Sequence, residues 1–272
     1  MTNTDRPRID AARWQRIREN DCTLPDGAHL PALVDELAEA LRDPDPAVRD
    51  GAPYTVLRLW IERDVIDEPQ RARLGAVMAE RFADPEIQAR TFAPLVLDMI
   101  ATRGDFDESW LAAFCRWYPA ETDLRGHDAE LGWLHAVAHG ADLLGTFGRH
   151  PAVDPAAMLA LAAERLLAPT DQILAQQEDD RLGHALARIL ARPGLTAEQS
   201  VQWLDPIEAH FAAGRPAGAP TTPAHTSNCL RTLRALYVLA DLGVRDGNAA
   251  PLEQLTHAAT VKRRLAEVLA RA

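Results

Sequence analysis

The sequence has few cysteines, few aromatic residues and almost no lysine. Three cysteines, Cys22, Cys115 and Cys229, lie far apart in the 272 residues and form no Cys-x-x-Cys pair. Such spacing argues against a disulfide framework and against a cysteine zinc site, and it is typical of a reducing compartment. Lys262 is the only lysine, so arginine supplies nearly all of the positive charge, a bias that we attribute to genome base composition.

Long apolar runs and well-known nucleotide motifs are also missing. No apolar run approaches the ~18 residues of a membrane-spanning helix, and the segment 1–8 lacks the apolar stretch of a signal peptide. The sequence has no Gly-rich phosphate loop, no Gly-x-Ser-x-Gly elbow and no dinucleotide fingerprint. We therefore expect a soluble, cytoplasmic protein that makes no use of a membrane.

The charge balance is acidic. The formal net charge is −11, from 40 acidic and 29 basic residues. A general nucleic-acid binder, or a protein that docks on anionic lipid, usually carries the opposite balance. The hydrophobic content of 47% is ordinary for a globular chain and excludes wholesale disorder.

Helix signals recur along the chain, whereas runs that alternate like strands are nearly absent. Four Asp-Pro pairs are placed as helix N-caps, Thr196 with Gln199 fits a capping box, and several segments are amphipathic. The pairs are Asp45-Pro46, Asp84-Pro85, Asp154-Pro155 and Asp205-Pro206. The segments are Leu30–Leu41, Val48–Ile61, Ile87–Ile100, Ala157–Leu167, Leu182–Leu190, Leu230–Leu242 and Leu252–Leu269. These patterns predict an all-α fold.

A repeat with an offset of 41 residues is visible in the first half. Asp43-Pro44 and Asp84-Pro85 share this offset, and so do Arg49 and Arg90. A period near 40 with an Asp-Pro turn is typical of HEAT repeats. We therefore predict a HEAT-like α-solenoid of stacked antiparallel helix pairs, as a single domain over 1–272. It begins with a helix and linker over 1–25, and a Pro/Gly-rich loop over 214–226 interrupts it as a slack connection rather than a lid.

The segment Asp128–Phe147 is the best candidate for a catalytic or ligand-binding site. Written as one helix at ~100° per residue, it is apolar nearly all round. One stripe is polar, because His135, His139 and Asp142 fall within roughly 60° of arc. We expect these three side chains to be buried together.

Three interpretations of this stripe are open. His135, His139 and Asp142 could bind one divalent metal ion such as zinc, they could form a metal-free acid–base or ligand site, or they could only bond to neighbouring helices. The metal interpretation lacks the glutamate of a metalloprotease, since Ala136 follows His135. A catalytic base would then come from elsewhere, and the candidates are Asp123, Glu178, Asp179 and Asp180.

Other residues join the candidate ligand-binding set. Asp123 and Arg125 flank a Gly turn and could orient a carboxylate or a phosphate, although an ion pair that closes the loop is the simpler prediction. Trp133 belongs to the set as part of the central segment. The other histidines are scattered, and we expect them to be exposed or structural.

The central residues resemble a known bacterial family, domain of unknown function 2785. The resemblance rests on Asp123-x-Arg125-Gly126, on Gly132-Trp133-x-His135-x-x-x-His139-Gly140-x-Asp142, and more weakly on Arg49-Asp50-x-x-x-Tyr54, Glu178-x-Asp180-Arg181 and Asn228-x-Leu230-Arg231. It spans roughly Leu30 to Leu242. It implies a helical-repeat fold, and it does not indicate any particular activity. Pro53 within the Arg-Asp segment predicts a bent helix.

Three functions compete. The leading prediction is a protein that binds a small molecule or a peptide in a central groove lined by the His/Asp stripe. The alternative is an enzyme, a metal-assisted or His-based hydrolase or lyase that uses His135, His139 and Asp142. A minor alternative is a DNA-facing HEAT-like protein, against which the net charge argues.

Overall fold

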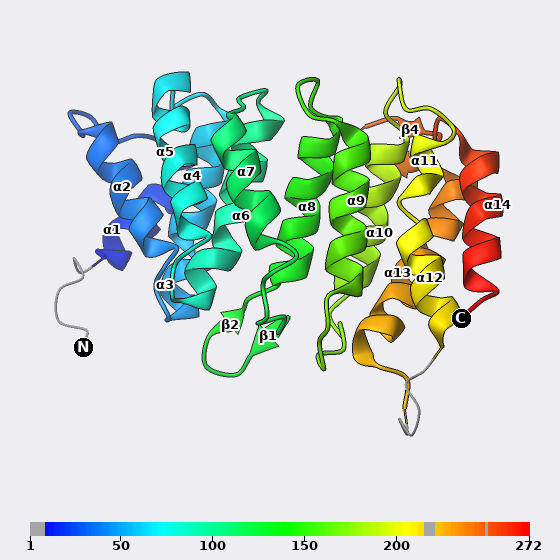
Figure 1. Ribbon diagram of the computed structural model, residues 1–272. Coiled ribbons are helices and arrows are strands. Elements are labelled where there is room, and N and C mark those ends of the chain that lie inside the picture. Colours follow the sequence, from blue (N-terminus) through cyan, green and yellow to red (C-terminus); the bar gives the residue numbers. More distant parts are fainter. Residues whose placement is uncertain (1–8, 215–220, 248–249) are drawn as a thin grey trace. The chain divides into compact units, whose positions relative to one another are not determined.

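The computed structural model describes residues 9–214, 221–247 and 250–272, and these residues are predominantly helical (Figure 1). The prediction of an all-α fold is confirmed. The chain divides into two compact units, residues 9–110 with His127–Leu134 and residues Leu111–Gly126 with His135–Ala272. The single domain that the sequence predicts over 1–272 stays a prediction.

The first unit contains six helices and one short strand pair among its described residues. They are α1 (Ala11–Glu19), α2 (Leu30–Ala40), α3 (Pro46–Arg49), α4 (Ala52–Glu62), α5 (Glu68–Arg81), α6 (Ile87–Thr102), β1 (His127–Asp128) and β2 (Gly132–Trp133). Helix α4 packs against α1, α2 and α6, and α5 packs against α2 and α6. The core includes Trp14 and Trp60, both fully buried, whose ring centroids lie 6.0 Å apart in an edge-to-face contact.

The two segments of the 41-residue repeat have matching local structure. Arg49 donates to the carbonyl oxygen of Asp43 at 3.2 Å, and Arg90 donates to the carbonyl oxygen of Asp84 at 2.8 Å. Each aspartate also accepts a backbone N–H two residues ahead, at 2.9 Å in both cases. The shared sequence pattern therefore encodes a shared turn.

Two details of this region differ from prediction. The helix expected over Val48–Ile61 is divided into α3 and α4 at Gly51, which precedes the first residue of α4 in a non-helical conformation. Pro53 consequently lies in the first turn of α4, where a missing N–H costs nothing, and the bend predicted there does not arise.

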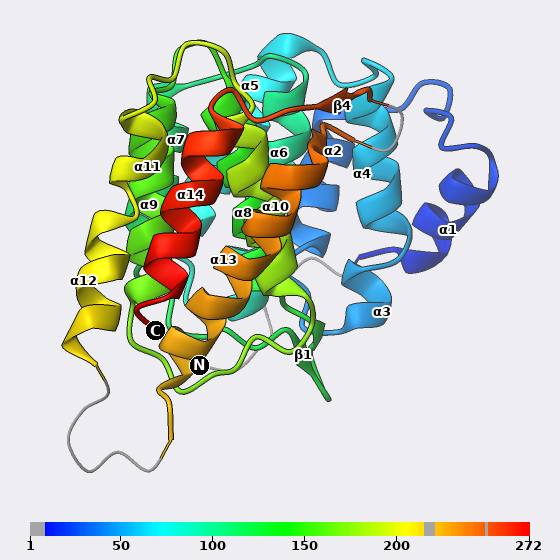
Figure 2. The same ribbon diagram turned by 90° about the vertical axis from the view of Figure 1, so that its right-hand side faces the viewer.

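Helix α7 (Glu108–Trp117) carries the chain from the first unit to the second. The second unit contains α8 (Ala136–Arg149), α9 (Pro155–Leu167), α10 (Glu178–Leu190), α11 (Gln199–Gln202), α12 (Asp205–Ala213), α13 (Ala224–Leu242), β3 (Val244–Arg245), β4 (Leu252–Glu253) and α14 (Ala258–Leu269). Helix α10 packs between α8 and α13, and α9 packs against all three. Figure 2 shows α14 between α13 and the α11–α12 segment, and it contacts each of them.

The predicted helix starts agree in part with the structure. Asp45 and Asp154 are N-caps whose carboxylates accept a backbone N–H, and Thr196 with Gln199 forms the reciprocal bonds of a capping box. Two Asp-Pro predictions are wrong in position, because Glu86 precedes α6 and Leu204 precedes α12. The predicted N-terminal helix is present as α1.

The C-terminal part differs in two places. The helix predicted from Leu252 begins only at Ala258, because Leu252 and Glu253 pair with β3 as an antiparallel strand. The Pro/Gly-rich loop predicted over 214–226 ends earlier, because α13 begins at Ala224, and its residues 215–220 lie outside the described part of the chain. Within the described ranges, no helix is long and apolar enough to cross a membrane.

Candidate functional site

The single helix predicted over Asp128–Phe147 is wrong in its first eight residues. Helix α8 begins at Ala136, and the preceding residues form an antiparallel strand pair, β1 with β2. Gly132 and His135 have φ angles of +69° and +51°, the left-handed conformation that no α-helix contains. His135 is the N-cap residue of α8, so it stands before the helix rather than on its face.

A buried arginine of the first unit holds this strand pair. Arg49 has no exposed surface, and its guanidinium donates to the carbonyl oxygens of Leu131 at 2.5 Å and Trp133 at 3.3 Å. Its Nε also donates to the carboxylate of Asp50 at 2.8 Å. The Arg-Asp pair of the sequence is therefore an anchor for backbone carbonyls more than 80 residues away.

In the second unit, His135 faces a buried carboxylate. Nδ1 of His135 lies 3.3 Å from Oε1 of Glu178, whose side chain is only 1% exposed. Oε2 of Glu178 accepts the backbone N–H of Gln176 at 2.8 Å. The rings of His135 and His139 lie 5.6 Å apart, centroid to centroid, and His139 is buried. The structure thus brings both predicted histidines together, with a glutamate from α10.

The environment of Glu178 favours its charged form. Burial alone would raise the pKa of Glu178, but the close approach of the His135 ring and the backbone N–H groups of Glu178 and Gln176 outweigh it. The pKa of Glu178 therefore lies below its ordinary value. Close approach is possible because Gly126 has no side chain, since a Cβ there would lie 2.2 Å from Oε1 of Glu178.

The third residue of the predicted stripe has a different partner. Asp142 of α8 pairs in bidentate fashion with Arg181 of α10, whose Nε donates to Oδ1 at 3.0 Å. No group of three or more His, Cys, Asp or Glu side chains is placed to hold a metal ion within the described residues. His135, His139 and Asp142 therefore do not form the predicted zinc-binding set, because Asp142 is turned toward Arg181.

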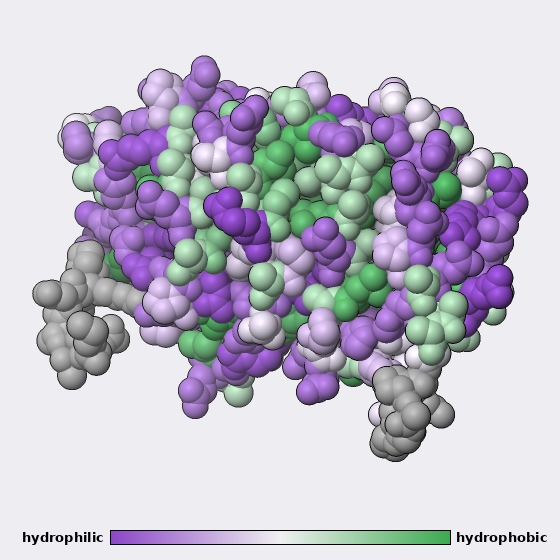
Figure 3. Space-filling model, viewed as in Figure 1, coloured by the Kyte–Doolittle hydropathy of each residue, from purple (hydrophilic) through white to green (hydrophobic). Residues whose placement is uncertain are grey.

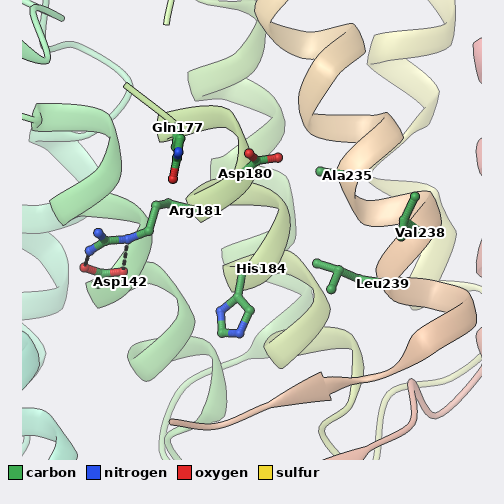
Figure 4. A pocket seen from close by; sticks show the side chains of 8 residues that line it. All are labelled: Asp142, Gln177, Asp180, Arg181, His184, Ala235, Val238 and Leu239. Atoms are coloured by element: carbon green, nitrogen blue, oxygen red, sulfur yellow. Dashed lines mark hydrogen bonds and ion pairs between the residues drawn. The ribbon is translucent and has the colours of Figure 1, made fainter. Parts of the chain in front are cut away.

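A hollow of about 630 Å³ opens beside this ion pair, and we call it the α10 hollow. Figure 4 shows polar side chains of α8 and α10 and apolar side chains of α13 around it. It is lined by Asp142, Gln177, Asp180, Arg181, His184, Ala235, Val238 and Leu239. A solvent-open space with one polar and one apolar wall can hold an amphipathic small molecule.

His184, which lines the α10 hollow, is uncharged at neutral pH. Its pKa is lowered by partial burial and by the charge of Arg188, and these effects outweigh the backbone hydrogen bond with Arg245 and the acidic groups nearby. The imidazole can therefore both accept and donate a hydrogen bond at neutral pH.

The remaining predicted ligand residues are elsewhere. Asp123 and Arg125 pair with each other at 2.8 and 2.6 Å, which is the loop-closing arrangement expected as the simpler alternative. Trp133 belongs to the first unit, is 46% exposed, and lies edge-on to His127 with ring centroids 4.8 Å apart. None of these three residues lines the α10 hollow.

The loop before α10 is held by residues of α13. Asn228 accepts the N–H of Leu174 at 3.0 Å and donates to the carbonyl oxygen of Gln172 at 2.9 Å. Arg231 pairs with Asp179 at 2.7 Å. Asp179, one of the candidate bases considered from the sequence, is thus half of an ion pair that joins α10 to α13.

A second hollow, of about 390 Å³, lies along α9 and faces α11 and α12. Its lining includes three alanines of α9 and the side chain of Trp203. Figure 3 shows hydrophobic residues over α9 on this face of the molecule. Glu164 is its only charged group among the described lining residues, so it has fewer groups that could bind a polar ligand than the α10 hollow has.

Sequence reasoning missed most of the α10 hollow. It included Asp142 as a site residue and Asp180 as a possible base, but not Gln177, Arg181 or His184. The available signal was their spacing, since Gln177, Arg181 and His184 recur at i, i+4 and i+7 and must share one face of a helix. The α13 wall carried no such signal, because its residues look like ordinary core positions.

These features define a class, an all-helical protein with a polar–apolar hollow between neighbouring helices. The chain belongs to the family described as protein of unknown function (DUF2785), whose model matches residues 78–238, more than half of the chain. The match includes the central segment and excludes Arg49-Asp50, which the sequence resemblance had included. Neither the curated proteins nor the solved structures contain a match.

Proposed function

We propose that this protein binds a small organic molecule in the α10 hollow. The observation that carries the proposal is the hollow itself, about 630 Å³ in volume, with charged and hydrogen-bonding groups facing an apolar helix. Small-molecule sites are commonly ~300–1,000 Å³ in volume and combine apolar lining with a few polar groups that fix orientation. Of the predicted stripe, Asp142 contributes to this site, while His135 lies beside Glu178 and the ring of His139 lies 5.6 Å from that of His135.

We also infer that the helices of each unit stack as HEAT-like repeats. The matching turns at Asp43 and Asp84 support this arrangement. Arginine side chains repeatedly reach backbone carbonyls one helix pair away, as Arg165 does at Glu121 over 44 residues and Arg192 at Gly148 over 44 residues. Contacts at this constant separation are what a stack of repeats of about 40 residues produces.

The cellular setting is a further part of the proposal. We propose a bacterial cytoplasmic protein, as the family resemblance and the cysteines suggest. Cys22, Cys115 and Cys229 are all free, and two of them are buried. Burial raises the pKa of Cys229 to about 12, so this thiol is unreactive at neutral pH.

A filling mutation tests the binding proposal. Ala235→Trp places a large ring in the α10 hollow, whereas Ala259→Trp makes the same change at an exposed position of α14. We expect the neutral fluorophore 1-aminoanthracene to bind the wild type and Ala259→Trp with equal affinity. Ala235→Trp should weaken binding at least about tenfold, which corresponds to ~1.4 kcal/mol. Circular dichroism confirms folding, and unchanged binding by a folded Ala235→Trp protein contradicts the proposal.

A second candidate function is acid–base catalysis by His135, which one observation favours. Its Nδ1 lies 3.3 Å from the buried carboxylate of Glu178, and a carboxylate so placed favours the tautomer that carries its proton on Nδ1, in which Nε2 is the basic nitrogen. The left-handed backbone of His135 adds to the case, because strained conformations cluster at functional sites.

Ester hydrolysis provides a first test of this candidate. We expect the wild type to hydrolyse p-nitrophenyl acetate and His135→Ala to be slower by about 100-fold or more, the usual contribution of a general base. His150→Ala, which alters a histidine at the end of α8, should keep the wild-type rate. A wild-type rate no higher than that of His135→Ala excludes His135 as a base for this reaction class.

A further inference from the structure

The charges that line the α10 hollow do not cancel. Asp142 and Arg181 neutralise each other through their bidentate pair. Asp180 adds a carboxylate that is exposed and has no ion pair or side-chain hydrogen bond with any residue of the described chain. Figure 4 shows this carboxylate directed toward the α13 side of the hollow, near Ala235. With His184 uncharged, the lining carries one net negative charge.

The uncharged polar groups of the lining accept hydrogen bonds. Gln177 has an amide oxygen, and His184 has one unprotonated ring nitrogen at neutral pH. A primary ammonium carries three N–H donors and so matches a carboxylate together with these acceptors. Among the described lining residues there is no Phe, Tyr or Trp, so the aromatic cage that selects quaternary ammonium groups is missing.

The opposite wall suits a hydrocarbon. Ala235, Val238 and Leu239 follow one another along one face of α13, and Val238 is 52% exposed. Covering such a side chain with an apolar ligand removes apolar surface from water and so stabilises the complex. The carboxylate of Asp180 lies at the edge of this wall, so charge and hydrocarbon are adjacent.

We propose that the α10 hollow binds a primary amine with an apolar body, the ammonium group on Asp180 and the hydrocarbon along Ala235, Val238 and Leu239. This inference rests on the proposed function and names the ligand class of the same site. A carboxylate or phosphate ligand would meet the unpaired charge of Asp180 and be repelled. A neutral alcohol would gain the apolar contact alone.

Four octyl probes separate the contributions of charge and hydrocarbon. Octylammonium, octyltrimethylammonium, octanol and octanoate are titrated into the full-length protein at neutral pH and low salt, with affinity measured by calorimetry. We expect octylammonium to bind about fivefold more tightly than octanol or the quaternary probe, which is the upper range for a solvent-exposed ion pair. Octanoate should bind more weakly than octanol.

A pair of charge-removing variants assigns the preference to Asp180. Asp180→Asn should lower the affinity for octylammonium about fivefold, to that of octanol, while leaving octanol binding unchanged. Asp171→Asn makes the same charge change at an exposed position outside the hollow and should keep wild-type affinities. Equal octylammonium affinity in Asp180→Asn and wild type overturns the proposal.

The outcomes distinguish this inference from the proposed function. If octanol or octanoate binds as tightly as octylammonium and Ala235→Trp blocks them all, the hollow is a binding site but its ligand class is not an amine. If neither the octyl probes nor 1-aminoanthracene binds the wild type, both proposals fail.

Discussion

Single residues of the second unit owe their properties to burial. Glu178 is charged although it is almost fully enclosed, because His135 and two backbone N–H groups stabilise the carboxylate. An enclosed charge is costly when a partner is removed, and its replacement by a neutral isostere has a measurable effect. Position 178 is therefore the most informative single residue for separating a structural from a functional role of the histidines.

Glu178→Gln should destabilise the protein in a pH-dependent way. Because the folded-state pKa of Glu178 is lowered, its charge stabilises the fold above its unfolded pKa of ~4.3, and this contribution is lost as the pH falls through the folded-state pKa. We expect the variant to lose about 2 kcal/mol of unfolding free energy at pH 7, and the difference from wild type to shrink below pH ~4.3. Urea denaturation at several pH values measures it.

The exposed Glu198→Gln is the matched control and should be neutral at every pH. A difference between Glu178→Gln and wild type that stays constant from neutral to strongly acidic pH would show that Glu178 contributes shape rather than charge.

At the scale of helices, α8 and α10 approach each other closely through glycines. A Cβ at Gly148 would lie 2.4 Å from Cγ1 of Ile189, and one at Gly145 would lie 2.7 Å from the guanidinium of Arg188. This close packing sets the position of Asp142 relative to Arg181, and therefore forms one side of the α10 hollow. Helix propensity and tertiary packing oppose each other at these glycines.

Gly148→Ala should destabilise the protein although alanine favours helices. The propensity gain is about 1 kcal/mol, and overpacking against Ile189 costs about 1–3 kcal/mol, so we expect a net loss near 1 kcal/mol. In a double-mutant cycle with Ile189→Ala the clash disappears. The double mutant should therefore lose less unfolding free energy than the sum of the losses of the two single mutants. Additive costs, measured by urea denaturation, would show that the clash is not the cause.

At the scale of the whole molecule, the net charge is acidic, yet many arginines form ion pairs with aspartate and glutamate side chains. The net charge of −11 does not prevent many arginines from forming ion pairs with aspartate and glutamate, as Arg231 does with Asp179 and Arg149 with Glu253. Family-motif residues mostly have this supporting role, since Asn228 and Arg231 hold the loop that leads into α10. The DNA-facing alternative is not tested by the structure and stays a prediction.

Much of the helical content could be predicted from the sequence, because its signals are local. Apolar periodicity and capping residues act within a few positions, so the predicted segments at α2, α6 and α9 lie close to the observed bounds. The segments predicted at α10 and α13 end at the observed residues but begin four and six residues too late. The pairing of Asp123 with Arg125 is also local. The side-by-side placement of His135 and His139 followed from a spacing of four residues, although the helix assumed for His135 was wrong.

The tertiary structure decided where α8 begins and what surrounds its polar residues. Arg49 takes the carbonyls of Leu131 and Trp133 from more than 80 residues away, and no local pattern reveals such a contact. Asp142 meets Arg181 only because α8 packs on α10, and the apolar wall comes from α13. The sequence thus determined the helices, through interactions between near neighbours, while the hollow arose from packing between helices whose contacts are distant along the chain.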